Sequence, residues 1–148
     1  MNGLEISRKI EFDAAHRVMG HEGRCKNLHG HRYTVWVYAF LQEGVGLDPL
    51  GRVVDFSVLK SKIGGWIDEY WDHQTILCRD DGDLIKAVSE FCSHGMPFLL
   101  PYNPTAENMA CFLLYEVAPI LFSGNKDIKI NKIVVEETPN CKATVERG

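Results

Sequence analysis

The chain has 148 residues, of which 45% are hydrophobic and 24% charged, and its formal net charge is −4. These values are ordinary for a globular protein and predict one domain over residues 1–148 with its own core. The acidic balance argues against a nucleic-acid partner, which needs a basic patch. No apolar run is long enough to span a bilayer and no signal peptide is visible, so we expect no membrane partner. Five cysteines without framework spacing indicate a reducing, cytoplasmic location.

Two segments near the start of the chain have the pattern of β-strands. Residues 4–16 alternate well enough to form one, and counting by twos places His16 on the same face as Ile10 and Phe12. Residues 31–41 are rich in aromatic and β-branched side chains, and both of their faces are apolar. We therefore expect helices to cover one face of this strand and another sheet or a partner subunit to cover the other.

Two longer segments have the pattern of amphipathic helices. Asp55 is a favourable N-cap, and apolar residues recur at helical spacing over residues 56–70, with Gly64 and Gly65 as a weak point. Thr105 caps a later helix whose apolar face runs to about residue 120. Pro119 should strain or end that helix, because proline lacks a backbone N–H.

Three further elements complete the expected fold. A short helix is predicted within residues 83–92, and strands are predicted at residues 128–137 and 143–146. Two strands come first along the sequence, the helices follow, and two strands come last. This order, with strands joined in hairpins, is typical of an α+β domain. The order of elements therefore predicts an antiparallel sheet with the helices on one face.

The most informative stretch is residues 25–31, Cys-Lys-Asn-Leu-His-Gly-His. In a strand, His29 and His31 project from one face while Gly30 turns away. If the two N-terminal strands pair antiparallel, His16 can face that pair. Three neutral imidazoles suit Zn²⁺ and leave a fourth coordination position open, which is the pattern of a catalytic zinc site.

Two other interpretations of these residues stay open at the level of sequence. A lone histidine on an apolar face is usually a core residue satisfied by a hydrogen bond, and for His16 alone that would be favoured. A closed structural zinc site is also compatible with the pattern, with Cys25 as the fourth ligand. The three histidines together, beside a cysteine and strand-like flanks, favour a metal site.

Five motifs occur in this order along nearly the whole chain. They are Phe-x-Ala-Ala-His at residues 12–16, Cys-x₃-His-Gly-His-x-Tyr at 25–33, Asp-His at 72–73, Pro-Thr-Ala-Glu-Asn at 104–108 and Glu-Thr at 137–138. Together they resemble the 6-pyruvoyl-tetrahydropterin synthase family. The Cys-x₃ spacing is similar to the bacterial 6-carboxy-tetrahydropterin synthase branch of queuosine biosynthesis, whereas pyruvoyl synthases resemble Cys-x₅.

The resemblance implies a fold and an assembly. The fold is the tunnelling fold, in which an antiparallel sheet carries helices on one face. Subunits close a β-barrel as trimers and stack into hexamers, so a homo-oligomer is expected. The doubly apolar second strand is the local observation that agrees with a shared barrel.

The resemblance also implies an activity. The expected enzyme is a zinc-dependent lyase that converts 7,8-dihydroneopterin triphosphate to 6-carboxy-tetrahydropterin and releases acetaldehyde and triphosphate. The alternatives are a 6-pyruvoyl-tetrahydropterin synthase, which eliminates triphosphate and keeps the side chain, and a pterin- or zinc-binding protein without turnover.

By the same resemblance, Cys25, Asp72 and His73 form a proton-relay set, and Glu137 anchors the pterin ring. Chemistry supports these roles, because a cation lowers the pKa of a thiol, histidine titrates near neutrality and a carboxylate accepts two parallel hydrogen bonds. The helix start at Thr105 would suit an anionic substrate group. Taken singly, each of these residues has an ordinary structural explanation.

Overall fold

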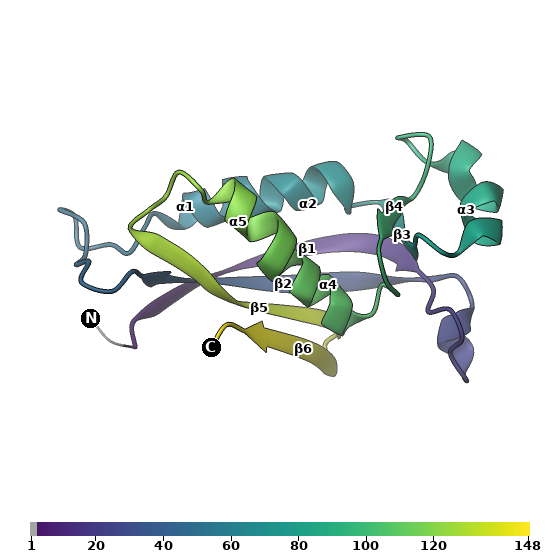
Figure 1. The fold of residues 1–148 in the computed structure, drawn as a ribbon, viewed down its shortest axis with the longest axis horizontal. Helices are drawn as coiled ribbons and strands as arrows, with labels where there is room; N and C mark the ends of the chain where they lie inside the picture. Colours follow the sequence, from purple (N-terminus) through teal and green to yellow (C-terminus); the bar gives the residue numbers. More distant parts are fainter. Residues whose placement is uncertain (1–2) are drawn as a thin grey trace.

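The computed structural model describes residues 3–148. Its six strands form one sheet in the order β4-β3-β1-β2-β5-β6 (Figure 1). The strands are β1 (Glu5–His16), β2 (His29–Leu41), β3 (Gln74–Cys78), β4 (Phe98–Leu100), β5 (Ile128–Thr138) and β6 (Cys141–Glu146).

Two long helices pack on one face of this sheet, as expected (Figure 1). The first combines α1 (Phe56–Leu59), a π-helical segment (Lys60–Gly64) and α2 (Gly65–Tyr70). The second combines α4 (Ala106–Phe112), a π-helical segment (Leu113–Val117) and α5 (Ala118–Leu121). A smaller helix, α3 (Gly82–Val88), is followed by a 3-10 turn (Ser89–Phe91) and lies beyond the β3 end of the sheet (Figure 1).

The four long strands are antiparallel, as the sequence predicts, and two short strands extend the sheet in parallel. β1 pairs with β2, β2 with β5, and β5 with β6, all antiparallel. β3 pairs with β1 and β4 with β3 in parallel, so the complete sheet is mixed. Sequence analysis did not predict β3 or β4, because strands of five and three residues are too short to show a clear period.

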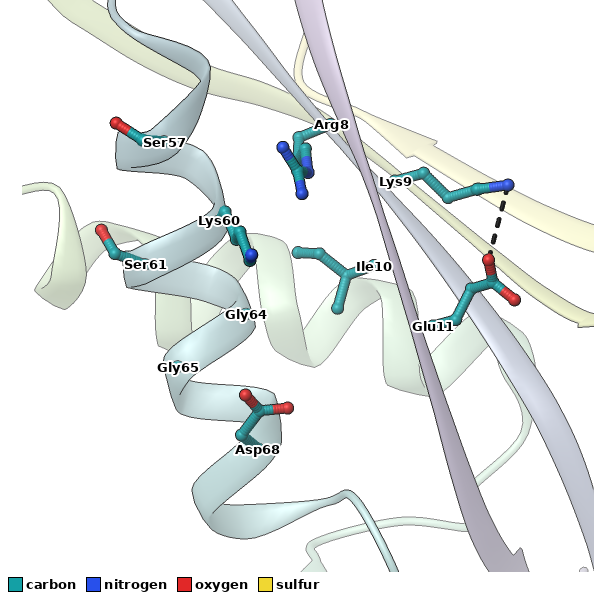
Figure 2. A pocket seen from close by; sticks show the side chains of 10 residues that line it. All are labelled: Arg8, Lys9, Ile10, Glu11, Ser57, Lys60, Ser61, Gly64, Gly65 and Asp68. Carbon is teal, nitrogen blue, oxygen red and sulfur yellow. Dashed lines mark ion pairs between the residues drawn. The ribbon is translucent and has the colours of Figure 1, made fainter.

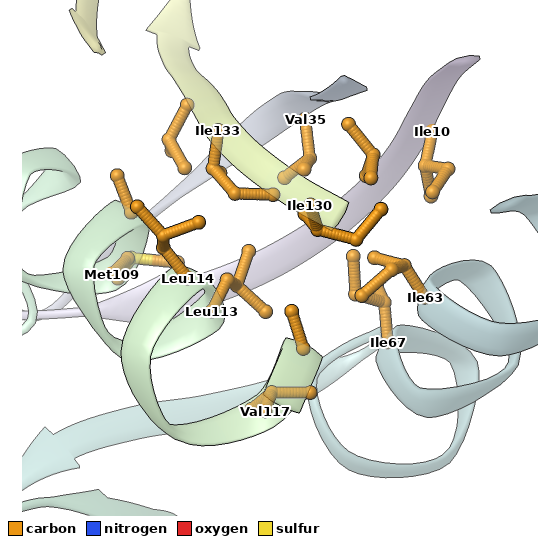
Figure 3. Close-up of a cluster of buried hydrophobic side chains, with 14 of the residues drawn as sticks. Ile10, Val35, Ile63, Ile67, Met109, Leu113, Leu114, Val117, Ile130 and Ile133 are labelled. Atoms are coloured by element: carbon orange, nitrogen blue, oxygen red, sulfur yellow. The ribbon is translucent and has the colours of Figure 1, made fainter. Parts of the chain in front are cut away.

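The hydrophobic core lies between the sheet and the two long helices. β1 and β2 contribute alternate residues, including Ile10 and Val35, while the first helix contributes Ile63 and Ile67 (Figure 3). The second helix contributes Met109 and its neighbours along the same face. The alternation places His16 on this core face, where its side chain is 1% exposed.

Both expected N-caps are present at the helix starts. The Asp55 carboxylate accepts a hydrogen bond from Ser57 N–H at 2.8 Å, and the Thr105 hydroxyl accepts one from Asn108 N–H at 3.1 Å. Pro119 does not end its helix, because it lies in the first turn of α5, directly after the π-helical segment. The backbone hydrogen-bond pattern already changes there, so the missing N–H is tolerated.

The opposite face of the sheet carries aromatic side chains that remain partly exposed. Trp36, Tyr38 and Phe40 project there from β2, away from both long helices. Trp36 Nε1 donates to the Glu136 carboxylate at 2.8 Å, and the Lys132 ammonium lies 4.2 Å from the centre of the Tyr38 ring. The second face of β2 is therefore apolar, as predicted, and the single layer of helices on the opposite face leaves it open (Figure 1).

Two further findings concern membranes and disulfides. Within residues 3–148, none of the helices has both the length and the apolar character that crossing a bilayer requires. All five cysteines carry free thiols.

Candidate metal centre and active site

Three histidines meet where β1 ends and β2 begins. His16 is paired directly with His29 in the antiparallel register, and His31 follows two residues later on the same face. The ring centres are 4.7 Å apart for His16 and His29, 5.1 Å for His16 and His31, and 4.8 Å for His29 and His31. Strand alternation and hairpin register are sufficient to bring the three imidazoles together.

Backbone carbonyls fix the orientation of two of these rings. His16 Nδ1 lies 2.7 Å from the carbonyl oxygen of Pro104, and His29 Nδ1 lies 2.6 Å from that of Asn27. A carbonyl oxygen can only accept, so each Nδ1 must donate, and in a neutral ring the lone pair is then on Nε2. This arrangement, with one nitrogen held by a carbonyl and the other free, is typical of metal-binding histidines.

Glu137 joins the histidines as a fourth member of the cluster. Its Oε1 lies 3.1 Å from His16 Nε2 and 2.9 Å from His31 Nε2. One potential ligand atom from each of the four side chains lies within 4.8 Å of all the others, and Cys25 is not part of this group. Glu136, the neighbouring acid, faces the other side of the sheet, where it accepts from Trp36.

The electrostatics of the cluster disfavour protonation of His31 and favour an ionised Glu137 carboxylate. Burial lowers the pKa of His31, and His16 and His29 act in the same direction, while Glu137 opposes them. The pKa of Glu137 is also lowered, mainly by its contact with His16, against the effect of burial. Burial raises the pKa of Tyr33, and the charges of Glu137 and Cys25 raise it further.

The donor set fits a metal ion. Among residues 3–148, the buried Nε2 atoms of His16 and His31 have no hydrogen-bond partner of acceptable geometry. Buried polar atoms without partners are costly, and these two face a common point beside a carboxylate. Imidazole nitrogens and carboxylate oxygens are ligands that Zn²⁺ accepts. The four side chains are therefore a candidate metal centre.

Cys25 lies near this centre but outside it. It is in the 3-10 turn Arg24–Lys26 between β1 and β2, is half-buried, and accepts a hydrogen bond at its carbonyl from Val18 N–H at 2.8 Å. Cys25 is close enough for a negative charge on its sulfur to raise the pKa of the Tyr33 phenol. The Tyr33 ring packs against the rings of His16 and His31 on the core side.

Asp72 and His73 form a second group just after α2. His73 Nδ1 lies 2.9 Å from Asp72 Oδ1, which also accepts from Asp13 N–H at 3.1 Å. The His73 N–H donates to the Asp13 carbonyl at 2.6 Å, and His73 has a φ of +60°, in the left-handed region. Its ring is 76% exposed. These contacts group the dyad with Asp13 rather than with Cys25.

A shallow groove is lined by residues of both groups. It has a volume of about 430 Å³, and both His31 and His73 line it. Its wall is low because Ala15 and Gly30 are small. A Cβ at Gly30 would lie 3.3 Å from the Ala14 carbonyl oxygen, so a larger residue would be tightly packed there.

The neighbourhood of His16 contains residues that sequence analysis did not identify. Arg17 forms a two-pronged ion pair with the buried Asp81, so its charge is already neutralised. Asn103 binds the backbone of Met19 through its side chain. Thr105 serves as the N-cap of α4, one residue after the carbonyl that holds His16. No local sequence signal marks such contacts, because their partners are more than 60 residues apart.

Comparison with known proteins identifies the family. The family model described as 6-pyruvoyl tetrahydropterin synthase matches residues 5–148. Proteins named 6-carboxy-5,6,7,8-tetrahydropterin synthase are 39% identical in Rickettsia felis and 40% identical in Rickettsia bellii, each over 93% of this chain and 96% of theirs. The protein of that name in Haemophilus influenzae is 30% identical over 92% of this chain and 94% of its own.

Solved structures confirm the fold. An uncharacterized protein from Wolinella succinogenes superposes with a TM-score of 0.76 at 22% identity, covering 98% of both chains. A 6-pyruvoyl tetrahydropterin synthase from Plasmodium falciparum gives 0.66 at 22% identity over 97% of both. The expected tunnelling fold is thus confirmed for the single chain. The sequence matches, together with the fold, show that this chain belongs to the 6-pyruvoyl tetrahydropterin synthase family.

Proposed function

We propose that the protein is a zinc-dependent lyase acting on 7,8-dihydroneopterin triphosphate. The reaction consumes one water and yields 6-carboxy-5,6,7,8-tetrahydropterin, acetaldehyde and triphosphate. The observation that carries the proposal is the convergence of His16, His29 and His31. Carbonyl oxygens orient the rings of His16 and His29, and the buried Nε2 atoms of His16 and His31 have no hydrogen-bond partner among the described residues. The names of the curated relatives support this substrate class.

His16, His29 and His31 would hold the zinc, with Glu137 beside them. When bound, zinc supplies a Lewis acid that polarises oxygen atoms and acidifies neighbouring C–H and O–H groups. The pterin substrate has a side chain with adjacent hydroxyl groups, which suits such a centre. The groove lined by His31 is a candidate path for that side chain to reach it.

The other residues of the site would bind substrate and move protons. The Cys25 thiol would take a proton from the substrate side chain, because a nearby cation favours its thiolate. His73 would exchange protons with the substrate, and Asp72 would orient its ring through the 2.9 Å contact. Glu137 would accept hydrogen bonds from the 2-amino group and the adjacent ring N–H of the pterin. The helix start at Thr105 would face an anionic group of the substrate.

We further propose that the active site is shared between subunits of a trimer or hexamer. β3 pairs with β1 only at Ala14–His16, so residues 5–13 of β1 have an edge without a strand partner in the described chain. A cavity of about 510 Å³ runs between this edge and the first helix, with Arg8, Ile10 and Lys60 at its walls (Figure 2). A strand of a second subunit at this edge would extend the sheet toward a closed barrel.

The choice between products rests on two observations. The Cys-x₃-His-Gly-His spacing and the names of the Rickettsia relatives favour the carboxy product, and with it a cytoplasmic role in queuosine biosynthesis. The competing activity is 6-pyruvoyl-tetrahydropterin synthesis, which shares the family and the fold. A binding protein without turnover is the third possibility.

One assay separates these functions. The purified, zinc-loaded protein is incubated with 7,8-dihydroneopterin triphosphate, and the pterin product and acetaldehyde are identified by mass spectrometry. We expect 6-carboxy-tetrahydropterin and one acetaldehyde per turnover. A pyruvoyl product without acetaldehyde would establish the competing synthase, and pterin binding without product would leave a binding protein.

A further inference from the structure

We infer that Asn103 is a positioning residue that holds the Cys25 loop in place relative to His16. The inference rests on the proposed function for the roles of Cys25 and His16, but its structural part does not. Asn103 lies between β4 and α4, far in sequence from the loop that follows β1. Its side chain joins these two segments.

The Asn103 carboxamide binds both backbone groups of one residue. Met19 N–H donates to Asn103 Oδ1 at 2.9 Å, and Asn103 Nδ2 donates to the Met19 carbonyl at 3.0 Å. This pair of bonds resembles the pairing of two strands. Because donor and acceptor are both matched, the orientation of the amide is fixed, and only the longer Gln carries the same pair of adjacent amide groups.

The contact at Met19 reaches Cys25 in one further step. Val18, the preceding residue, donates its N–H to the Cys25 carbonyl at 2.8 Å. The segment 18–25 therefore forms a closed loop whose first part is attached to Asn103. Arg17, which precedes this loop, is held by Asp81 and not by Asn103. The bonds of Asn103 therefore act on residues 18–25, the segment that contains Cys25.

The backbone of Asn103 is attached to the metal centre and to α4. Its carbonyl accepts from Thr105 N–H and from Asn108 Nδ2, both at 2.9 Å. The next residue, Pro104, provides the carbonyl that holds the His16 ring. Asn103 thus connects the loop of Cys25, the carbonyl that holds His16 and the start of α4. The distance between Cys25 and His16 therefore depends on the bonds of one side-chain amide.

The test compares Asn103→Ala with Asn131→Ala in the full-length, zinc-loaded protein. Asn131 is a matched control, because its Nδ2 also donates to a backbone carbonyl, that of Arg147 at 3.1 Å, at a half-buried position on β5. Asn103→Asp keeps the acceptor for Met19 N–H but places an oxygen against the Met19 carbonyl in place of the donor. Hydrogen exchange of residues 17–25, zinc content, steady-state kinetics and the pH profile of Cys25 alkylation by iodoacetamide are measured for each.

We expect Asn103→Ala to keep one zinc per chain and a cooperative unfolding transition. Hydrogen exchange of residues 17–25 should be about ten-fold faster, with β2 and β5 unchanged. The kcat should fall about 10- to 100-fold with little change in KM, since misplacement of a reacting group affects the chemical step. The midpoint of Cys25 alkylation should move to higher pH as the thiol leaves the centre. Asn103→Asp should have an effect at least as large as Asn103→Ala, because its carboxylate repels the Met19 carbonyl, and Asn131→Ala should match the parent protein.

Two results would overturn the inference. Unchanged exchange over residues 17–25 would show that the amide does not hold the loop, and unchanged kcat and alkylation despite faster exchange would show that the loop does not position the thiol. If the parent protein fails to turn over dihydroneopterin triphosphate, the proposed function fails, and exchange and alkylation alone decide the role of Asn103.

Discussion

Glu136 and Glu137 are adjacent in β5, yet their carboxylates lie on opposite faces of the sheet. Only Glu137 reaches the histidine cluster, while Glu136 is occupied by Trp36. We predict that Glu137→Gln weakens pterin binding by about 2–5 kcal/mol, because a buried charge-assisted contact loses its charge. Titration calorimetry with dihydroneopterin measures this. Glu136→Gln is the control, and equal losses in both variants would disprove the assignment.

Cys25 distinguishes an open metal site from a closed one. The cluster does not include the thiol, so we predict that Cys25→Ala keeps zinc close to one per chain. Activity should fall about 100-fold or more, the usual contribution of an acid–base group. Zinc is measured by atomic emission on dialysed protein. Loss of the metal together with the activity would instead favour a structural site completed by the cysteine.

Strand alternation was enough to predict that the three histidines share a face. The pattern places His29 and His31 two residues apart, and an antiparallel register brings His16 opposite them. The links to Asn103 and Asp81 could not be predicted, because they join segments more than 60 residues apart through single side chains. Predicting such contacts requires the tertiary arrangement.

At the scale of elements, periodicity predicted the long strands and both long helices. It failed for β3 and β4, which are short and depend on neighbouring strands for their pairing. It also overstated the effect of Gly64, Gly65 and Pro119, because the two π-helical segments keep the helices continuous at those positions.

Two glycines test this interpretation, Gly65 in the first helix and Gly51 in the loop before that helix. Gly65 has helical geometry, is exposed and has free space around its Cα, so Gly65→Ala should stabilise the protein by about 0.5–1 kcal/mol. Gly51 has a φ of +87°, so Gly51→Ala should destabilise it by about 1 kcal/mol. Chemical denaturation at one protein concentration measures both changes. The same sign for both variants would contradict the helix geometry at residue 65.

At the scale of the whole molecule, one chain leaves the face of Trp36, Tyr38 and Phe40 partly open and keeps Cys25 apart from the His73 dyad. We predict that Cys25→Ala and His73→Ala subunits, each inactive alone, regain part of the activity when mixed under conditions that allow exchange. In a shared site, some pairs of mixed subunits would combine an intact thiol with an intact dyad.

The outcome depends on assembly, which light scattering measures in the same samples. A fully active monomer would disprove both the oligomer and the shared site. Failure to complement, in assemblies whose subunit exchange is confirmed by mass spectrometry, would disprove only the shared site.

The left-handed backbone of His73 has a consequence for how such a chain could change over evolutionary time. Glycine would adopt the φ of +60° without the side-chain clash, a difference of about 1 kcal/mol in favour of folding. Histidine at position 73 therefore lowers the stability of the fold relative to glycine. Its ring is largely exposed, so packing does not require a histidine there. A descendant released from selection for this chemistry would be expected to drift toward glycine or asparagine at position 73 while keeping its fold.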